Sequence, residues 1–148
     1  MFKRSLLVCS LFASILAWGQ DVDSESQYES LDMSVTFDRT YRMTIPTLYA
    51  VPNVVMLPIG ELFDFLKVPN KVSTDGQVIT GFFENEANSF EINNLKKFVT
   101  YKGQTYPFTK DESTTDIGIL YLKTTVFKRA FGFDMAFNDR SLSLQFTS

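Results

Sequence analysis

Residues 54–66, which read VVMLPIGELFDFL, predict an apolar strand that passes directly into a short helix. Pro58 suits the first turn of that helix, because this turn requires no amide hydrogen from it. After it, apolar side chains recur at i, i+3, i+4 and i+7, which places one apolar face against a sheet. These side chains are Ile59, Leu62, Phe63 and Leu66. The helix is expected to end before Pro69, because the residue that precedes a proline is pushed out of the helical region.

A second copy of this unit lies 65 residues further along the chain. Residues 119–131, which read ILYLKTTVFKRAF, repeat the order of apolar strand and amphipathic helix, and Gly132 supplies a left-handed end to the helix. The offset superposes apolar positions of the two copies: Met56 on Tyr121, Leu57 on Leu122, Leu62 on Phe127, Leu66 on Phe131 and Val68 on Phe133. Each copy continues into a hairpin, so the duplicated strand-helix-hairpin units span about 54–83 and 119–148.

Turn signals divide the rest of the duplicated region into further strands. Asp75-Gly76 predicts a tight hairpin turn in the first unit, and residues 138–141 occupy the matching place in the second. Between the units, residues 89–92 predict a strand, and residues 98–108 predict a hairpin that turns at Lys102-Gly103. Pro107 marks the second strand of this hairpin as an outer strand, because proline cannot donate to a sheet ladder.

The N-terminal part of the domain alternates apolar and polar residues at 33–37 and again at 41–45, as strands with one buried face do. Pro46 and Pro52 are expected to confine the residues between them to an edge strand or a loop. The sequence therefore predicts a single α+β domain over 33–148. Its sheet is mainly antiparallel, with two short helices that come from the duplicated unit.

Residues 1–19 have the parts of a secretory signal peptide. A positively charged start is followed by an apolar run shorter than the roughly 20 residues that span a bilayer. Small residues then predict cleavage between Gly19 and Gln20. An uncleaved anchor is the alternative, whereas Cys9 has too little apolar sequence before it for a lipid-attachment signal. We therefore expect an exported chain, in the periplasm, at the cell surface or secreted, with no stable membrane span after cleavage.

Removal of the signal leaves a chain without cysteine, tryptophan or histidine, because Cys9 and Trp18 are the sole residues of their types. Disulfides, thiolate chemistry, imidazole metal sites and histidine-dependent triads are thereby excluded, and no cofactor or metal is expected. The signal holds two of the 14 basic residues and none of the 17 acidic ones, so the exported chain carries a charge of −5. This balance argues against a nucleic-acid partner, which needs a basic surface. Residues 20–32 are acidic and polar, and we expect a flexible lead-in there.

Catalytic motifs are not found in the sequence. There is no serine-hydrolase elbow, phosphate loop or dinucleotide turn. Four carboxylates could in principle form acid–base pairs, but nothing in their spacing brings two of them together. These are Glu61, Asp64, Glu84 and Glu86. We therefore expect a protein that is not an enzyme.

Aromatic residues are the candidate contacts for a partner or ligand. Phe82 and Phe83 are adjacent on a predicted strand and so point to opposite faces, which places one of them outside the core or under a partner. Tyr101 and Tyr106 flank the turn of the next hairpin. These four residues, together with Tyr121, could form a platform for sugar rings or for the side chains of another protein.

The repeated unit resembles the copper amine oxidase N-terminal-like domain, a module of many secreted and surface-attached bacterial proteins. The resemblance lies in MLPIGEL at 56–62, YKGQ at 101–104, and LYL at 120–122 through FGF at 131–133. It extends from Val54 to the end of the chain and departs from the family where Lys123 takes the place of the helix-opening proline. The resemblance implies an appended module and no copper site.

Together, export and the resemblance suggest a non-catalytic cell-envelope module that binds another protein or a wall polysaccharide. The open strand at 104–108 could accept a strand from such a partner. The alternative is a small carbohydrate- or ligand-binding protein that uses exposed Tyr and Phe rings together with carboxylates.

Overall fold

The computed structural model describes residues 27–147. The predicted signal peptide at 1–19, its cleavage site at Gly19 and Gln20, and the first part of the acidic lead-in lie outside the described residues. The strands of the larger sheet are β1 (Glu29–Phe37), β2 (Tyr41–Ala50), β3 (Val54–Pro58), β9 (Ser113–Asp116), β10 (Ile119–Lys123), β11 (Asp134–Asn138) and β12 (Ser143–Thr147). Those of the smaller sheet are β4 (Asn70–Val72), β5 (Val78–Phe82), β6 (Ser89–Asn93), β7 (Phe98–Tyr101) and β8 (Gln104–Pro107).

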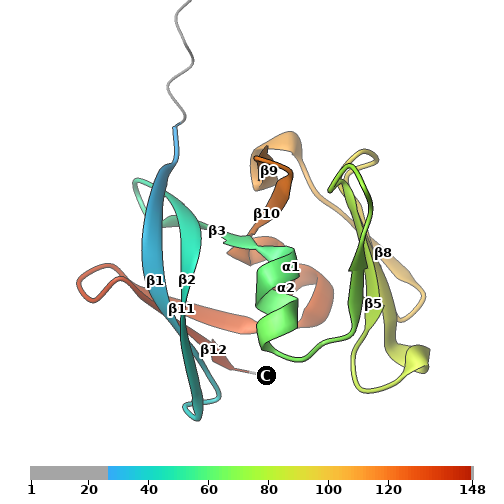
Figure 1. Cartoon of the computed structure of the whole chain (residues 1–148), viewed down its shortest axis with the longest axis horizontal. Coiled ribbons are helices and arrows are strands. Elements are labelled where there is room, and N and C mark those ends of the chain that lie inside the picture. The colour runs from blue at the N-terminus through green and yellow to red at the C-terminus, as the bar shows by residue number, and fades with distance from the viewer. Residues whose placement is uncertain (1–26, 148) are drawn as a thin grey trace, which may run out of the picture.

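The two α-helices, α1 (Ile59–Phe65) and α2 (Thr124–Phe131), lie between the two sheets (Figure 1). The larger sheet has the strand order β11-β12-β1-β2-β3-β10-β9, and the smaller one runs β4-β5-β6-β7-β8. β1 and β12 pair in parallel, whereas the other ladders are antiparallel. Two short 3₁₀ turns, η1 (Glu86–Asn88) and η2 (Lys110–Glu112), complete the connections. The predicted α+β class, mainly antiparallel with two short helices, is confirmed.

Both copies of the duplicated unit form a strand, a helix and a hairpin, in that order. The first copy is β3, α1, β4 and β5, and the second is β10, α2, β11 and β12. The two hairpins belong to different sheets: β4 and β5 begin the smaller sheet, whereas β11 and β12 form the edge of the larger one. As predicted, α2 ends at Gly132, whose φ of 77° is left-handed. The duplicated units therefore connect the two sheets.

The main core fills the space between the sheets, around the two helices. Phe63 of α1 and Phe127 of α2 are both fully buried there, with ring centroids 6.4 Å apart. The larger sheet contributes Met33 and Val35 from its inner face, and the smaller sheet contributes Ile92. A second, smaller apolar cluster of Leu48, Met56 and Tyr121 lies on the opposite face of β2, β3 and β10. That separation follows from strand alternation, because Leu57 and Leu122 point to the helices while their neighbours point away.

The first strand begins earlier than the sequence predicts. We expected residues 20–32 to form a flexible lead-in, but β1 starts at Glu29, so the prediction is wrong for residues 29–32. Residues 29–32 pair with the C-terminal half of β2. The buried Thr47 hydroxyl also donates a 2.8 Å hydrogen bond to the carbonyl oxygen of Leu31. Backbone pairing therefore orders a segment that has little apolar surface to bury.

Pro46 and Pro52 do not confine the residues between them to an edge or a loop, contrary to the prediction. β2 continues through Pro46 to Ala50 and lies inside the larger sheet. Pro46 faces Asp32 of β1, while β3 pairs with β2 only from Leu48 onward. The missing amide hydrogen of Pro46 therefore falls in the half of β2 where β3 makes no ladder bonds, which is how a proline is tolerated in a strand.

β8 forms an edge of the smaller sheet and carries Pro107, which confirms the outer strand that Pro107 predicts. Neither helix of the described residues is long and apolar enough to cross a membrane.

Candidate functional site

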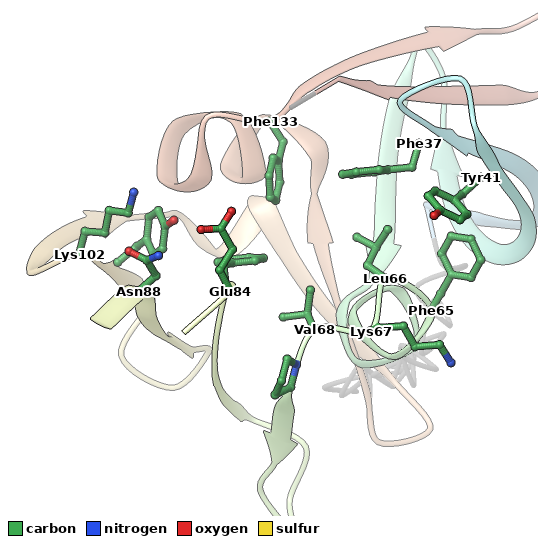
Figure 2. A pocket seen from close by; sticks show the side chains of 13 residues that line it. Phe37, Tyr41, Phe65, Leu66, Lys67, Val68, Glu84, Asn88, Lys102 and Phe133 are labelled. Carbon is green, nitrogen blue, oxygen red and sulfur yellow. The ribbon is translucent and has the colours of Figure 1, made fainter. Parts of the chain in front are cut away.

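One cleft of about 900 Å³ opens where the ends of several elements meet. Figure 2 shows side chains from different elements converging on this space: Phe37 from β1, Leu66 and Val68 from the end of α1, and Phe133 from the segment after α2. We call it the aromatic cleft. Its lining comprises Phe37, Tyr41, Phe65, Leu66, Lys67, Val68, Pro69, Phe83, Glu84, Asn88, Tyr101, Lys102 and Phe133.

Edge-to-face ring contacts hold the aromatic lining together. The Phe83 ring lies 5.6 Å from that of Tyr101 and 5.6 Å from that of Phe133, centroid to centroid, with both pairs nearly perpendicular. Phe37 meets Phe133 in the same manner at 6.5 Å. Beneath them, Phe131 of α2 contacts Phe83 at 5.2 Å and joins the cluster to the core. Such pairs are favourable because the positive edge of one ring meets the negative face of the next. The cleft therefore has a lining fixed by packing.

Tight turns beside the lining residues aim them into the cleft. After α1 the chain turns at Lys67, whose φ of 57° is left-handed. The amide of Val68 then donates a 2.8 Å hydrogen bond to the carbonyl oxygen of Phe63, so Val68 folds back beside the helix end. Left-handed residues also follow Phe83 and Tyr101, at Glu84 and Lys102. The lining residues beside these turns therefore lie near the ends of their strands or helix.

The rim of the cleft is polar and carries both signs of charge. Glu84 and Lys102 are exposed, and Asn88 is half-buried beside them (Figure 2). The Lys102 ammonium lies 5.2 Å from the centroid of the Tyr101 ring, within reach of a cation–π interaction. Tyr41, the first residue of β2, is 64% exposed at the mouth. The cleft thus combines an apolar interior with a hydrogen-bonding edge.

The structure brings together two of the aromatic residues that the sequence singles out. Phe83 and Tyr101 touch each other and line the cleft. Phe82 is half-buried but does not line it, as expected from its opposite direction on the strand. Tyr106 packs against the main core, and its hydroxyl donates a 2.9 Å hydrogen bond to Gln104 Oε1. Phe82 and Tyr106 are therefore not part of this site.

Four aromatic lining residues were not predicted from the sequence: Phe37, Tyr41, Phe65 and Phe133. The duplication could have indicated Phe133, because the 65-residue offset superposes it on Val68, and both residues line the cleft. Phe37 and Tyr41 face each other across the end of the β1–β2 ladder. Their part in the cleft depends on how that hairpin packs against the segment after α2, where Phe37 meets Phe133. Alternation along a strand does not reveal such a contact.

The candidate carboxylates are scattered over the surface. Glu61 and Glu86 are exposed, and Asp64 accepts a 2.8 Å hydrogen bond from the side chain of Asn70. Glu84 lies at the cleft, and the other three do not line it. Within residues 27–147, no group of three or more acidic, His or Cys side chains could hold a metal ion.

A buried serine and a half-buried lysine form the arrangement that most resembles a reactive pair. Lys97 Nζ donates hydrogen bonds to Ser113 Oγ at 2.9 Å and to Asn94 Oδ1 at 2.7 Å, and burial lowers the pKa of Lys97. Ser113 itself donates to Asn94 Oδ1 at 2.7 Å and is only 6% exposed. These residues do not line the aromatic cleft. The cluster ties the turn after β6 to β9, which is a structural role.

No protein-family model, curated protein or solved structure matches this chain. The resemblance to the copper amine oxidase N-terminal-like domain stays a prediction, and the site is assigned from its geometry.

Proposed function

We propose that this chain is an exported, non-catalytic binding module of the cell envelope, whose aromatic cleft takes an apolar segment of another protein. The observation that carries the proposal is the cleft itself, an aromatic-lined space of about 900 Å³ with a polar rim. Pockets of this kind bury the apolar part of a ligand and orient it with a few polar groups. Export rests on the signal-like residues 1–19.

The distribution of apolar and polar groups favours a peptide segment. Protein interfaces have an apolar centre with aromatic anchors, surrounded by a polar rim that excludes water. Phe37, Phe83 and Phe133 supply the centre, while Glu84 and Lys102 supply rim groups for a peptide backbone or for charges of either sign. The exposed Tyr41 ring at the mouth can close over an inserted side chain.

A random peptide library selected on the exported chain tests this function. We expect the selected sequences to share a Phe, Leu or Ile anchor. Their affinity should fall by about tenfold for Tyr41→Ala, which removes the exposed ring at the mouth of the cleft. Tenfold corresponds to about 1.4 kcal/mol, the scale of one interface contact. Leu95→Ala is the matched control, because Leu95 is 66% exposed, like Tyr41 at 64%, but does not line the cleft. Peptides without an apolar anchor, or equal losses in both variants, would contradict the proposal.

Carbohydrate binding is the second candidate, and the rim favours it. Asn88, Glu84 and Lys102 line the same cleft as the Tyr101 ring, and this combination of ring and hydrogen-bonding groups suits a sugar. A glycan array separates the two functions: glycan binding that Tyr101→Ala abolishes, in the absence of peptide binding, would favour the sugar.

A further inference from the structure

A polar groove lies on the other side of the β1–β2 hairpin from the aromatic cleft. It has a volume of about 710 Å³ and crosses the outer face of β2, β1 and β12. We call it the arginine groove and define it by Ser34, Thr36, Arg39, Arg42, Ser143 and Gln145. The only apolar residue that lines it, Leu144, is itself 1% exposed. The groove is therefore lined mainly by polar and charged side chains.

Strand register sets these side chains in rows. Arg42 of β2 lies opposite Thr36 of β1, and Thr36 lies opposite Gln145 of β12. In the next outward-facing row, Ser34 of β1 lies opposite Ser143 of β12. Residues that pair across a ladder share one face, and neighbouring strands are about 4.8 Å apart. The groove is thus a regular grid of hydroxyl and amide groups with a guanidinium at one end.

The arginines of the groove form no ion pair with a carboxylate in the described part of the chain. The two ion pairs found among residues 27–147 join Lys128 to Asp134 and Arg129 to Glu112, so neither involves Arg39 or Arg42. No carboxylate lines the groove. A guanidinium is suited to a carboxylate or phosphate because its planar N–H groups can make two parallel hydrogen bonds. The arginines of this surface are therefore suited to an anionic ligand.

Size and chemistry point to a sugar polymer. A peptide segment normally anchors an interface through buried apolar side chains, and this groove has no exposed apolar pocket to receive them. Nucleic acid is disfavoured, because the whole chain has a net charge of −3 and lacks the extended basic surface that phosphate backbones need. A polysaccharide with acidic groups supplies both the anions for the arginines and the hydroxyls for the serine, threonine and glutamine side chains.

We propose that the arginine groove binds an acidic polysaccharide, with its carboxylate held by Arg39 and Arg42 and its hydroxyls by the side chains of β1 and β12. This site is separate from the aromatic cleft and does not rest on the function proposed for it. Because the chain as a whole is acidic, the attraction must be local to these arginines. Binding is therefore expected to weaken steeply with added salt.

Affinity electrophoresis of the exported chain in gels that contain polygalacturonate tests the site. We expect retardation by polygalacturonate, little by neutral dextran, and a loss of at least tenfold in affinity on Arg42→Gln. Arg42→Lys should keep part of the affinity, because it retains the charge but not the paired hydrogen bonds. Lys71→Gln is the matched control, since it removes one exposed charge from β4 in the other sheet. Unchanged urea midpoints confirm that the variants are folded.

A parallel measurement with polyphosphate distinguishes recognition of a sugar from attraction to negative charge alone. Polyphosphate should bind more weakly than polygalacturonate, because it lacks hydroxyls for the polar rows. The proposal is overturned by the absence of retardation, by equal binding of polyphosphate, or by an equal effect of Arg42→Gln and Lys71→Gln. None of these results would bear on peptide binding in the cleft, which Tyr41→Ala reports.

Discussion

Leu57 of β3 and Leu122 of β10 lie directly opposite each other in an antiparallel ladder, and they are the same position of the duplicated unit. On either side, Met56 pairs with Lys123 and Pro58 with Tyr121, so the register is symmetric about this central pair. Both leucines are fully buried beneath the two helices. The two copies are therefore arranged as they would be around a two-fold axis through this pair. The paired strands β3 and β10 pack together against both helices.

The copies diverge after their helices, and the aromatic cleft lies where they diverge. Val68 and Phe133 occupy equivalent positions, one residue before a proline and one residue after a glycine. From there the first copy enters the smaller sheet and the second enters the larger one. Both residues line the cleft because the two copies take different paths on either side of it.

Phe131→Ala is expected to lower the free energy of unfolding by about 3–5 kcal/mol, as removal of a packed core ring does. The Phe131 ring lies within 6.2 Å of six others: Phe63, Phe83, Phe90, Tyr101, Phe127 and Phe133. Phe137→Ala is the comparison, because the ring of Phe137 lies near that of Tyr49 alone among the described aromatic residues. Urea denaturation measures both; an equal effect of the two variants would show that the aromatic cluster has been misjudged.

Two glycines are expected to respond to alanine in opposite directions. A Cβ at Gly81 would overlap the carbonyl oxygen of Pro69 and the ring of Phe90, so Gly81→Ala should lower stability by about 1–3 kcal/mol. At Gly60, inside α1, a Cβ would meet only the Val72 side chain at 3.5 Å. Gly60→Ala should therefore raise stability by about 0.5–1 kcal/mol, the helix preference of alanine over glycine. Thermal unfolding of the pair checks this, and a destabilised Gly60→Ala would mean that α1 is misplaced.

Glu112 is expected to contribute stability that disappears in acid. Burial raises the pKa of Glu112, but hydrogen bonds from the Arg129 guanidinium and the Thr109 amide outweigh burial and hold the pKa below its usual 4.5. The contribution is present above pH 4.5 and is lost as the pH falls through the lowered pKa of the folded state. The stability gap between the native chain and Glu112→Gln should shrink below pH 4.5. A gap that stays constant with pH would refute the pairing.

Lys97 is expected to affect the stability of the fold at alkaline pH. Burial lowers the pKa of Lys97 from 10.5, so its ammonium is disfavoured in the folded state. This penalty is complete below the lowered pKa and is relieved as the pH rises toward 10.5, where the folded state has released its proton. Native stability should therefore rise relative to Lys97→Met between neutral pH and 10.5. Parallel stability curves for the two chains would show that Lys97 remains hydrated.

Most of the fold was predictable because its signals are local. Proline and glycine mark the ends of α1 and α2, and the apolar period of each helix is unambiguous. The start of β1 was not predictable, because residues 29–32 are ordered by pairing with distant residues of β2. The path of β2 through Pro46 was missed for a related reason: whether a proline is tolerated depends on the neighbouring strand.

The site was predictable only in part. Phe83 and Tyr101 stood out as aromatic residues on strands near turns, but the same pattern also selected Phe82 and Tyr106, which lie elsewhere. Phe37 and Tyr41 reach the cleft from the β1–β2 hairpin, where the Phe37 ring meets those of Phe133 and Phe146. Such contacts between distant elements leave no periodic trace in a sequence.

Fluorescence of a single introduced tryptophan tests most directly whether the aromatic cleft binds a peptide. Trp18 is the only tryptophan of the chain and belongs to the predicted signal, so the exported Tyr41→Trp variant reports from the mouth of the cleft alone. The best peptide from the library selection should shift its emission to shorter wavelength and saturate, whereas a scrambled peptide should not. The same titration of Leu95→Trp should show no shift. An unchanged Tyr41→Trp spectrum, or equal shifts in both variants, would contradict binding in the cleft.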